Sequence, residues 1–137
     1  MKDEDLLKEA EKARKMSYSP YSHFQVGAAL LTESGKIYYG CNIENAGYSS
    51  TNCAERTAFF KAVSEGERNF KKIAIAGGKE SETADTPCMP CGVCRQVMME
   101  FCNPETFQIV IADGKKGCQL FTLEELLPFG FGPDNLK

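Results

Sequence analysis

The sequence has no excess of positive charge, no long apolar run and no low-complexity tract. It carries 16 Lys and Arg against 19 Asp and Glu, and its net charge is -3. A protein that binds a nucleic-acid polymer through the phosphates normally has a basic excess. A DNA or RNA substrate is therefore disfavoured, although this argument does not reach a ligand without phosphates, such as a free nucleoside.

The N-terminal segment lacks the apolar core of a secretory signal, because charged residues begin at Lys2. No apolar run approaches the length of a membrane span. We therefore expect a cytoplasmic protein, in a compartment that keeps thiols reduced. The seven cysteines are an odd number and several are clustered. Such cysteines indicate metal binding or catalysis rather than a disulfide framework.

The hydrophobic periodicity predicts alternating helices and strands, without an internal repeat or a linker. The expected order is α, β, β, α, β, α, β, β, α, over residues 3–16, 26–32, 36–42, 53–63, 71–78, 92–101, 107–112, 118–122 and 122–127. Strands that alternate with helices require crossovers, which place helices on both faces of a sheet. The sequence therefore predicts one α/β domain over residues 1–137, a three-layer α/β/α sandwich with a mixed sheet of about five strands.

The stretch TPCMPCGVCRQ places three cysteines within seven residues. Cys91 and Cys94 lie three residues apart at the predicted start of a helix, so they share a face and can hold one metal ion. Cys88 precedes Pro90, outside the helix, and its direction is undetermined. Cys53 begins the other internal helix, and helix N-termini favour thiolates. If both helices begin at the same edge of the sheet, three sulfurs converge.

The spacing alone leaves two other metal sites open. A ferredoxin-type iron–sulfur run needs a fourth cysteine four positions after Cys94, and the chain has Met98 there. A closed structural zinc site would need a fourth ligand, which Cys88, Cys102 or the lone His23 could supply. The chain would then be a non-catalytic zinc module.

Glu55 follows Cys53 by two residues, on the first turn of the same predicted helix. A carboxylate beside a metal with an open coordination position can take a proton from bound water, whose pKa zinc lowers to about 7. An acidic residue at this place is also favoured by the helix dipole alone. Glu55 is therefore a candidate catalytic base with a plain structural alternative.

The cysteines and Glu55 together form the pattern C-A-E…P-C-x-x-C, over residues 53–55 and 90–94. This pattern resembles the zinc-dependent cytidine deaminase superfamily. Residues 21–24, 42–45, 53–58, 94–96 and 131–133 are similar to the small homotetrameric cytidine deaminases, and the resemblance covers nearly the whole chain. The Cys88-Met89 pair before the second motif departs from the family pattern and adds a spare thiol.

The resemblance implies a hydrolase that converts cytidine and deoxycytidine to uridine and deoxyuridine with release of ammonia, in pyrimidine salvage. One zinc ion per subunit would be held by Cys53, Cys91 and Cys94. Zinc-bound hydroxide would attack C4 of the base. Glu55 would take the water's proton, pass it to N3, and later protonate the departing amine. A deaminase of another aminated nucleoside analogue is the alternative within this class.

The resemblance also assigns the remaining site residues. It implies that Asn42 and Glu44 contact the ribose, that Phe24 and Tyr48 shape the pocket, and that the Ala54 backbone N–H contacts the base. It further implies a homotetramer in which Phe131 reaches a neighbouring subunit's site. Arg56 would tune the charge of the thiolates. Three thiolates on Zn²⁺ leave a net charge of about -1, and a guanidinium that donates to a sulfur would withdraw part of it. Arg56 has a plain alternative as a surface residue.

Phe129 and Phe131 stand in a tail punctuated by glycine and proline. Two aromatic side chains there should not face water unprotected. They can pack on their own domain, or, as the resemblance implies for Phe131, on a neighbouring subunit. No glycine-rich phosphate loop or arginine cluster is visible, which disfavours a nucleotide as the substrate.

Overall fold

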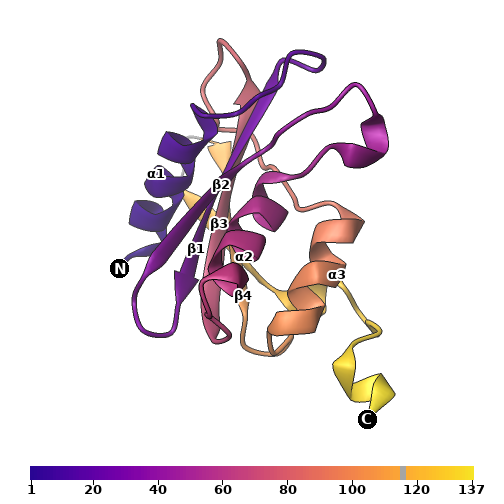
Figure 1. The fold of residues 1–137 in the computed structure, drawn as a ribbon. Coiled ribbons are helices and arrows are strands. Elements are labelled where there is room, and N and C mark those ends of the chain that lie inside the picture. Colours follow the sequence, from indigo (N-terminus) through magenta and orange to yellow (C-terminus); the bar gives the residue numbers. More distant parts are fainter. Residues whose placement is uncertain (115–116) are drawn as a thin grey trace.

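A single mixed sheet organises the computed structural model, which describes residues 1–114 and 117–137. The strands are β1 (Phe24–Thr32), β2 (Ile37–Cys41), β3 (Phe70–Lys79), β4 (Gln108–Ala112) and β5 (Cys118–Thr122). Their order across the sheet is β2-β1-β3-β4-β5 (Figure 1). Among the described strands, β3 and β4 pair in parallel. The pairs β1–β2, β1–β3 and β4–β5 are antiparallel. The predicted mixed five-stranded sheet is confirmed.

Helices cover both faces of the sheet (Figure 1). The helix α1 (Asp3–Arg14) lies on one face, and α2 (Ala54–Ser64) and α3 (Gly92–Phe101) lie on the other. The core has one cluster on each face, with Leu6 on the α1 side and Phe59 on the α2 side, both fully buried. The three-layer arrangement expected from the element order is therefore present.

The helix α2 sits close to the sheet because small residues face each other. Ala54, Ala58 and Ala62 are fully buried along one side of this helix. On the strand β2, a Cβ added at Gly40 would come within 2.2 Å of the Ala54 carbonyl oxygen. Any side chain at Gly40 would therefore push the start of α2 away from the sheet, and with it the residues that begin the helix.

Several boundaries differ from the predicted ranges for local reasons. The helix α1 ends at Arg14 rather than at residue 16, because Lys15 and Met16 bond to carbonyls three residues back and tighten the last turn. The strand β1 begins at Phe24, two residues early, because Phe24 pairs with Lys79 of the long β3. The short helix α4 (Leu123–Leu126) begins with a capping box, as the spacing of Thr122 and Glu125 predicts.

Two single-turn segments lie within the described residues, η1 (Tyr48–Ser50) and η3 (Pro133–Leu136). The tail that contains η3 ends beyond α3, at the margin of the molecule (Figure 1). Over residues 1–114 and 117–137, none of the helices has both the length and the apolar character that crossing a membrane requires.

Candidate active site

Three cysteine sulfurs meet where α2 and α3 begin. Cys53 is the N-cap of α2, Cys91 is the N-cap of α3, and Cys94 lies on the first turn of α3. The Sγ atoms of Cys53 and Cys91 are 3.7 Å apart, those of Cys91 and Cys94 are 3.4 Å apart, and all three lie within 4.8 Å of one another. Tetrahedral zinc with Zn–S bonds of about 2.3 Å needs sulfurs about 3.8 Å apart. The cluster therefore fits a zinc ion in both spacing and donor type.

The surroundings of this cluster favour a thiolate at Cys53. Hydrogen bonding from Cys94, and then from Arg56, lowers the pKa of Cys53, whereas the pKa of Cys94, as the donor, is raised. The Nη2 atom of Arg56 donates to the Cys53 sulfur at 3.2 Å. The Arg56 Nε atom is buried without a hydrogen-bond partner among the described residues. The guanidinium charge is thus held beside the sulfurs and compensates negative charge there.

Glu55 lies beside the cluster on the first turn of α2, and only 4% of it is exposed. Burial, together with the negative charge of Cys53, raises the pKa of Glu55 to about 7. Burying a carboxylate costs free energy unless its charge is paired or the group is protonated. Its burial next to three potential metal ligands favours a catalytic base over the plain alternative of an acid placed there by the helix dipole alone.

A fourth protein ligand is not part of this cluster within the described residues, which group only Cys53, Cys91 and Cys94. Cys102 is the C-cap of α3, at the opposite end of that helix. His23 points to Glu80, with 3.4 Å between Nδ1 and Oε2, and its side chain is largely exposed. Burial raises the pKa of Cys88 to about 11, and its sulfur is not among the three that lie within 4.8 Å of one another. A tetrahedral zinc ion held by these three sulfurs would keep one position open, as catalytic zinc sites do.

A cavity of about 170 Å³ opens directly onto the cluster. Its lining comprises Val26, Asn42, Thr51, Asn52, Cys53, Ala54, Glu55, Cys88, Met89 and Cys91. Cys88 is therefore a wall of this cavity, which its place before the proline did not reveal. The Cys88 sulfur packs against the backbone of Gly77. A Cβ added at Gly77 would come within 2.5 Å of this sulfur and within 3.1 Å of the Phe24 ring.

A second cavity, of about 410 Å³, adjoins the first through Thr51, which lines both. It is lined by Tyr21, Ser22, Glu44, Asn45, Tyr48 and Thr51. Tyr48 stands on η1 and is 82% exposed, so in one chain it closes little of the cavity. The structure thus groups Asn42, Ala54 and Glu55 in one cavity, with Glu44 and Tyr48 in the next.

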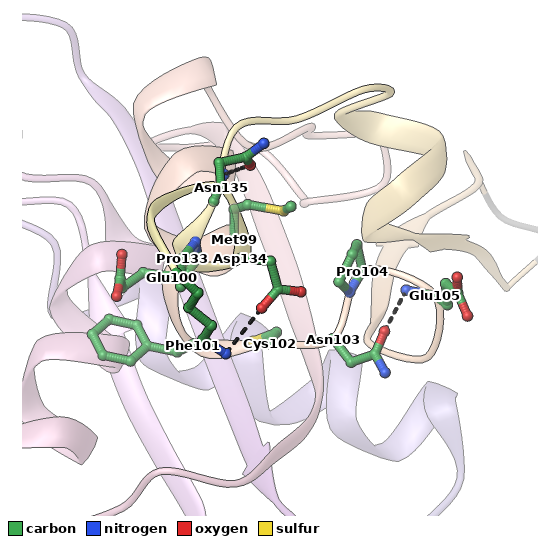
Figure 2. Close-up of a pocket in the computed structure, with 12 residues that line it drawn as sticks. Met99, Glu100, Phe101, Cys102, Asn103, Pro104, Glu105, Pro133, Asp134 and Asn135 are labelled. Carbon is green, nitrogen blue, oxygen red and sulfur yellow. Dashed lines mark hydrogen bonds and ion pairs between the residues drawn. The ribbon is translucent and has the colours of Figure 1, made fainter.

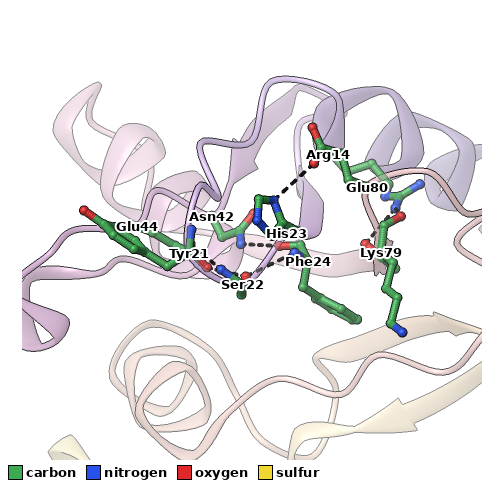
Figure 3. Close-up of polar contacts among 10 residues, drawn as sticks. Arg14, Tyr21, Ser22, His23, Phe24, Asn42, Glu44, Lys79 and Glu80 are labelled. Carbon is green, nitrogen blue, oxygen red and sulfur yellow. Dashed lines mark hydrogen bonds and ion pairs between the residues drawn. The ribbon is translucent and has the colours of Figure 1, made fainter.

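Asn42 and Glu44 hold the loop before β1 in place (Figure 3). The Asn42 Nδ2 atom donates to the Phe24 carbonyl at 2.8 Å, and its Oδ1 accepts from Val26 N–H and from the Ser17 hydroxyl. The Glu44 carboxylate accepts from the backbone N–H groups of residues 21 and 22 and from the Ser22 hydroxyl. Sequence reasoning gave Ser22 no role, because only the folded loop brings it to a carboxylate 22 residues away.

Phe131 does not line either of these two cavities. It is 58% exposed, and its carbonyl accepts a hydrogen bond of 2.8 Å from Gln96 Nε2 on α3. The cavity beside this tail, of about 500 Å³, lies at the far end of α3 (Figure 2). Its lining includes Cys102, Asn103 and Asp134, and neither Glu55 nor the cysteine cluster. The larger cavity is therefore not where the chemistry-bearing residues meet.

The comparisons with known proteins agree with this geometry. Residues 1–110 match the family model of the cytidine and deoxycytidylate deaminase zinc-binding region. A cytidine deaminase of Sporosarcina psychrophila is 51% identical, over 98% of this chain and 94% of its own length. One of Halalkalibacterium halodurans is 48% identical, over 96% of each chain.

The fold has solved counterparts as well. The crystal structure of cytidine deaminase from Burkholderia pseudomallei superposes with a TM-score of 0.86 at 43% sequence identity. The superposition covers 96% of this chain and 100% of the Burkholderia chain. The chain belongs to the family of cytidine and deoxycytidylate deaminases that carry this zinc-binding region.

Proposed function

We propose that the chain is a zinc-dependent hydrolase that deaminates cytidine and deoxycytidine to uridine and deoxyuridine, with release of ammonia. The observation that carries this proposal is the convergence of three cysteine sulfurs on a buried Glu55 at the floor of a cavity. The family membership and the relatives named cytidine deaminase support the choice of base.

Cys53, Cys91 and Cys94 would hold the zinc ion. When bound, zinc makes a water molecule acidic enough to serve as a nucleophile at neutral pH. Glu55 would take the first proton of the attacking water and donate it to N3 of the base. It would then take the second proton, from the hydroxyl now on C4, and give it to the amine that leaves as ammonia. Because this carboxyl is buried, water does not compete for its proton.

The base would be oriented by the start of α2. Ala54 is the first residue of this helix, so its N–H has no partner inside the helix. Ala54 also lines the cavity beside Glu55. The free N–H can therefore donate to an acceptor on the base while Glu55 acts on the other atoms of the same ring.

The ribose would bind through the groups that the loop leaves free. Asn42 uses one of its two Nδ2 hydrogens on Phe24 and both acceptor positions of Oδ1 on Val26 and Ser17, so it has one N–H left to donate. The hydrogen bond from Ser22 lowers the pKa of Glu44, which remains an acceptor. One sugar hydroxyl can accept from Asn42 and donate to Glu44, which suits an uncharged nucleoside.

Arg56 would tune the cluster. Its 3.2 Å contact with the Cys53 sulfur and its buried Nε place positive charge beside the three thiolates. Withdrawing charge from a ligand sulfur makes the bound metal a stronger Lewis acid. A role in catalysis therefore explains this residue better than a surface position does.

The test of this function is turnover with and without a metal chelator. Purified protein should convert cytidine to uridine and ammonia, lose this activity when the metal is removed, and regain it with added Zn²⁺. Product formation is followed by chromatography, and the metal content is measured in parallel. A folded, zinc-loaded protein that leaves cytidine and deoxycytidine intact would contradict the proposal and direct the search to other aminated nucleosides.

The active assembly would be a homotetramer in which Phe131 completes a neighbouring subunit's site. In the single chain Phe131 is half exposed and outside both cavities, and Tyr48 leaves the second cavity open. A neighbouring tail would cover this opening and give Phe131 a base to stack on. The hydrogen bond from Gln96 fixes the backbone of Phe131 so that the ring can project from its own subunit.

Phe131→Ala is expected to lower kcat/KM by about tenfold or more, because base–aromatic stacking contributes about 1–3 kcal/mol. Thermal melting should shift little, since the ring is half exposed. Phe129→Ala is the matched control, because Phe129 is a fully exposed aromatic of the same tail. Full wild-type activity in a monomer, established by analytical ultracentrifugation, would rule out the shared site.

A further inference from the structure

We infer that Ser22 and His23 form a positioning elbow that aligns Glu44 and Phe24 for the substrate. The inference rests on the proposed function, because Glu44 and Phe24 meet a nucleoside only in a nucleoside deaminase. It assigns a role to two residues that touch neither the cysteine cluster nor the reacting base. The elbow lies between the second cavity and the start of β1 (Figure 3).

Ser22 joins the Glu44 carboxylate and the backbone of Phe24 through one hydroxyl group. Its Oγ donates to Oε2 of Glu44 and accepts from the Phe24 backbone N–H at 3.1 Å. Its own N–H donates to Oε1 of Glu44 at 3.1 Å. The direction of the Glu44 carboxylate and the start of the strand that carries the Phe24 ring are therefore set by the same side chain.

His23 makes the turn that this geometry requires. Its φ is 56°, in the left-handed region that L-residues rarely adopt. The reversal lets the Phe24 N–H donate back to the Ser22 hydroxyl, while the Phe24 ring points away from the polar network (Figure 3). Histidine is among the few residues that tolerate this region, together with glycine, asparagine and aspartate.

Both flanks of the turn are fixed, so a strained residue there cannot relax by moving them. The His23 N–H donates to the Ser19 carbonyl at 3.0 Å, and its own carbonyl accepts from Glu80 N–H at 2.8 Å. Arg14 clamps the adjoining strand ends, because its guanidinium donates to the carbonyls of Gln25 and Gly78. A residue that disfavours the left-handed region should therefore depopulate the elbow itself.

The His23 side chain is a favourable site for the test, because it is 66% exposed and contacts Glu80. Valine disfavours the left-handed region, so a smaller fraction of His23→Val molecules should have the elbow in the conformation that binds substrate. Because the apparent affinity falls in proportion to this fraction, KM for cytidine should rise by at least about fivefold. The change in kcat should stay within about twofold, and the zinc content should not change. His23→Asn and His23→Gly should keep the wild-type KM.

Two controls separate backbone conformation from other effects. Glu80→Gln removes only the charged contact between His23 and Glu80 and keeps the backbone of the turn, so KM should not change. Gly35→Val places a β-branched residue at φ +96°, in the β1–β2 turn where no heavy atom lies within 4 Å of an added Cβ. It should lower the melting temperature without changing KM. This control therefore shows whether backbone strain outside the elbow is enough to alter substrate binding.

A readout independent of activity follows from the hydrogen bonds to Glu44. An NMR titration should find the Glu44 pKa higher in His23→Val than in His23→Asn, because both lack the imidazole but only the first disturbs Ser22. This comparison tests the elbow even if wild-type protein does not act on cytidine, an outcome that would reject the proposed function alone.

The elbow would be overturned by any of three results. They are a wild-type KM in His23→Val, equal damage in His23→Asn and His23→Val, or an identical Glu44 pKa in these two variants. If His23→Val fails to fold, Ser22→Ala replaces it, because alanine removes the bridging hydroxyl and keeps the backbone bond to Glu44. Ser22→Ala should also raise KM at least about fivefold, and a wild-type KM there would equally reject the inference.

Discussion

Replacing Glu55 by glutamine is expected to lower kcat for cytidine by about a hundredfold to ten-thousandfold, the range that general acid–base catalysis contributes. The amide has nearly the shape of the carboxyl but cannot take a proton from water or give one to N3 and the leaving amine. Glu55 is buried beside the cysteine cluster, so bulk water cannot replace its function. Steady-state and single-turnover rates should fall together, because the chemical step itself is slowed.

The interpretation of this variant depends on what does not change. Glutamine leaves the three sulfurs of the cluster in place, so the variant should bind one zinc ion per chain. Its melting temperature should stay close to that of the wild type, because no volume is removed from the start of α2. A Glu55→Gln protein that deaminates cytidine at a near-normal rate would show that another group carries the proton.

Replacing Cys94 by alanine is expected to abolish both zinc binding and turnover. Cys94 is buried between the other two sulfurs and α2, with its Sγ 3.4 Å from that of Cys91. Two remaining ligands cannot complete a zinc site, and even outer partners of metal ligands change affinity by 10–100-fold. The affinity should therefore fall by more than about a hundredfold, measured by competition with a chromogenic zinc chelator.

Cys88→Ala is the matched control for this experiment. Cys88 also lies in the wall of the cavity, but its sulfur is outside the three-sulfur group. The Cys88→Ala protein should keep one zinc ion per chain. Loss of zinc in Cys88→Ala, with zinc retained in Cys94→Ala, would reverse the assignment of ligand and spare thiol.

The prediction of the fold from sequence succeeded where the signal is local. The continuous apolar run within 71–78 and the helical spacing in 3–16 are both patterns that a short window of the chain displays. The capping box at Thr122 is likewise contained in four consecutive residues. The boundaries differed where a distant strand extended the pairing, as β3 does for Phe24.

The candidate site required both kinds of information. The sequence by itself determined that Cys91 and Cys94 share a helical turn, and it placed Glu55 two residues after Cys53, because these relations span less than one turn. Only the tertiary structure decided that Cys53 meets Cys91 across 38 residues, since this depends on the strand order that brings both helix N-termini together.

The surroundings of the site were decided by the tertiary structure in the same way. The cavity wall at Cys88, the bond between Ser22 and Glu44, and the left-handed turn at His23 each join segments that no short window contains. The sequence determined the chemical groups because they are local properties of the chain. Their distances and directions were decided by the packing of helices on the sheet, because that packing is a cooperative property of all the strands and helices together.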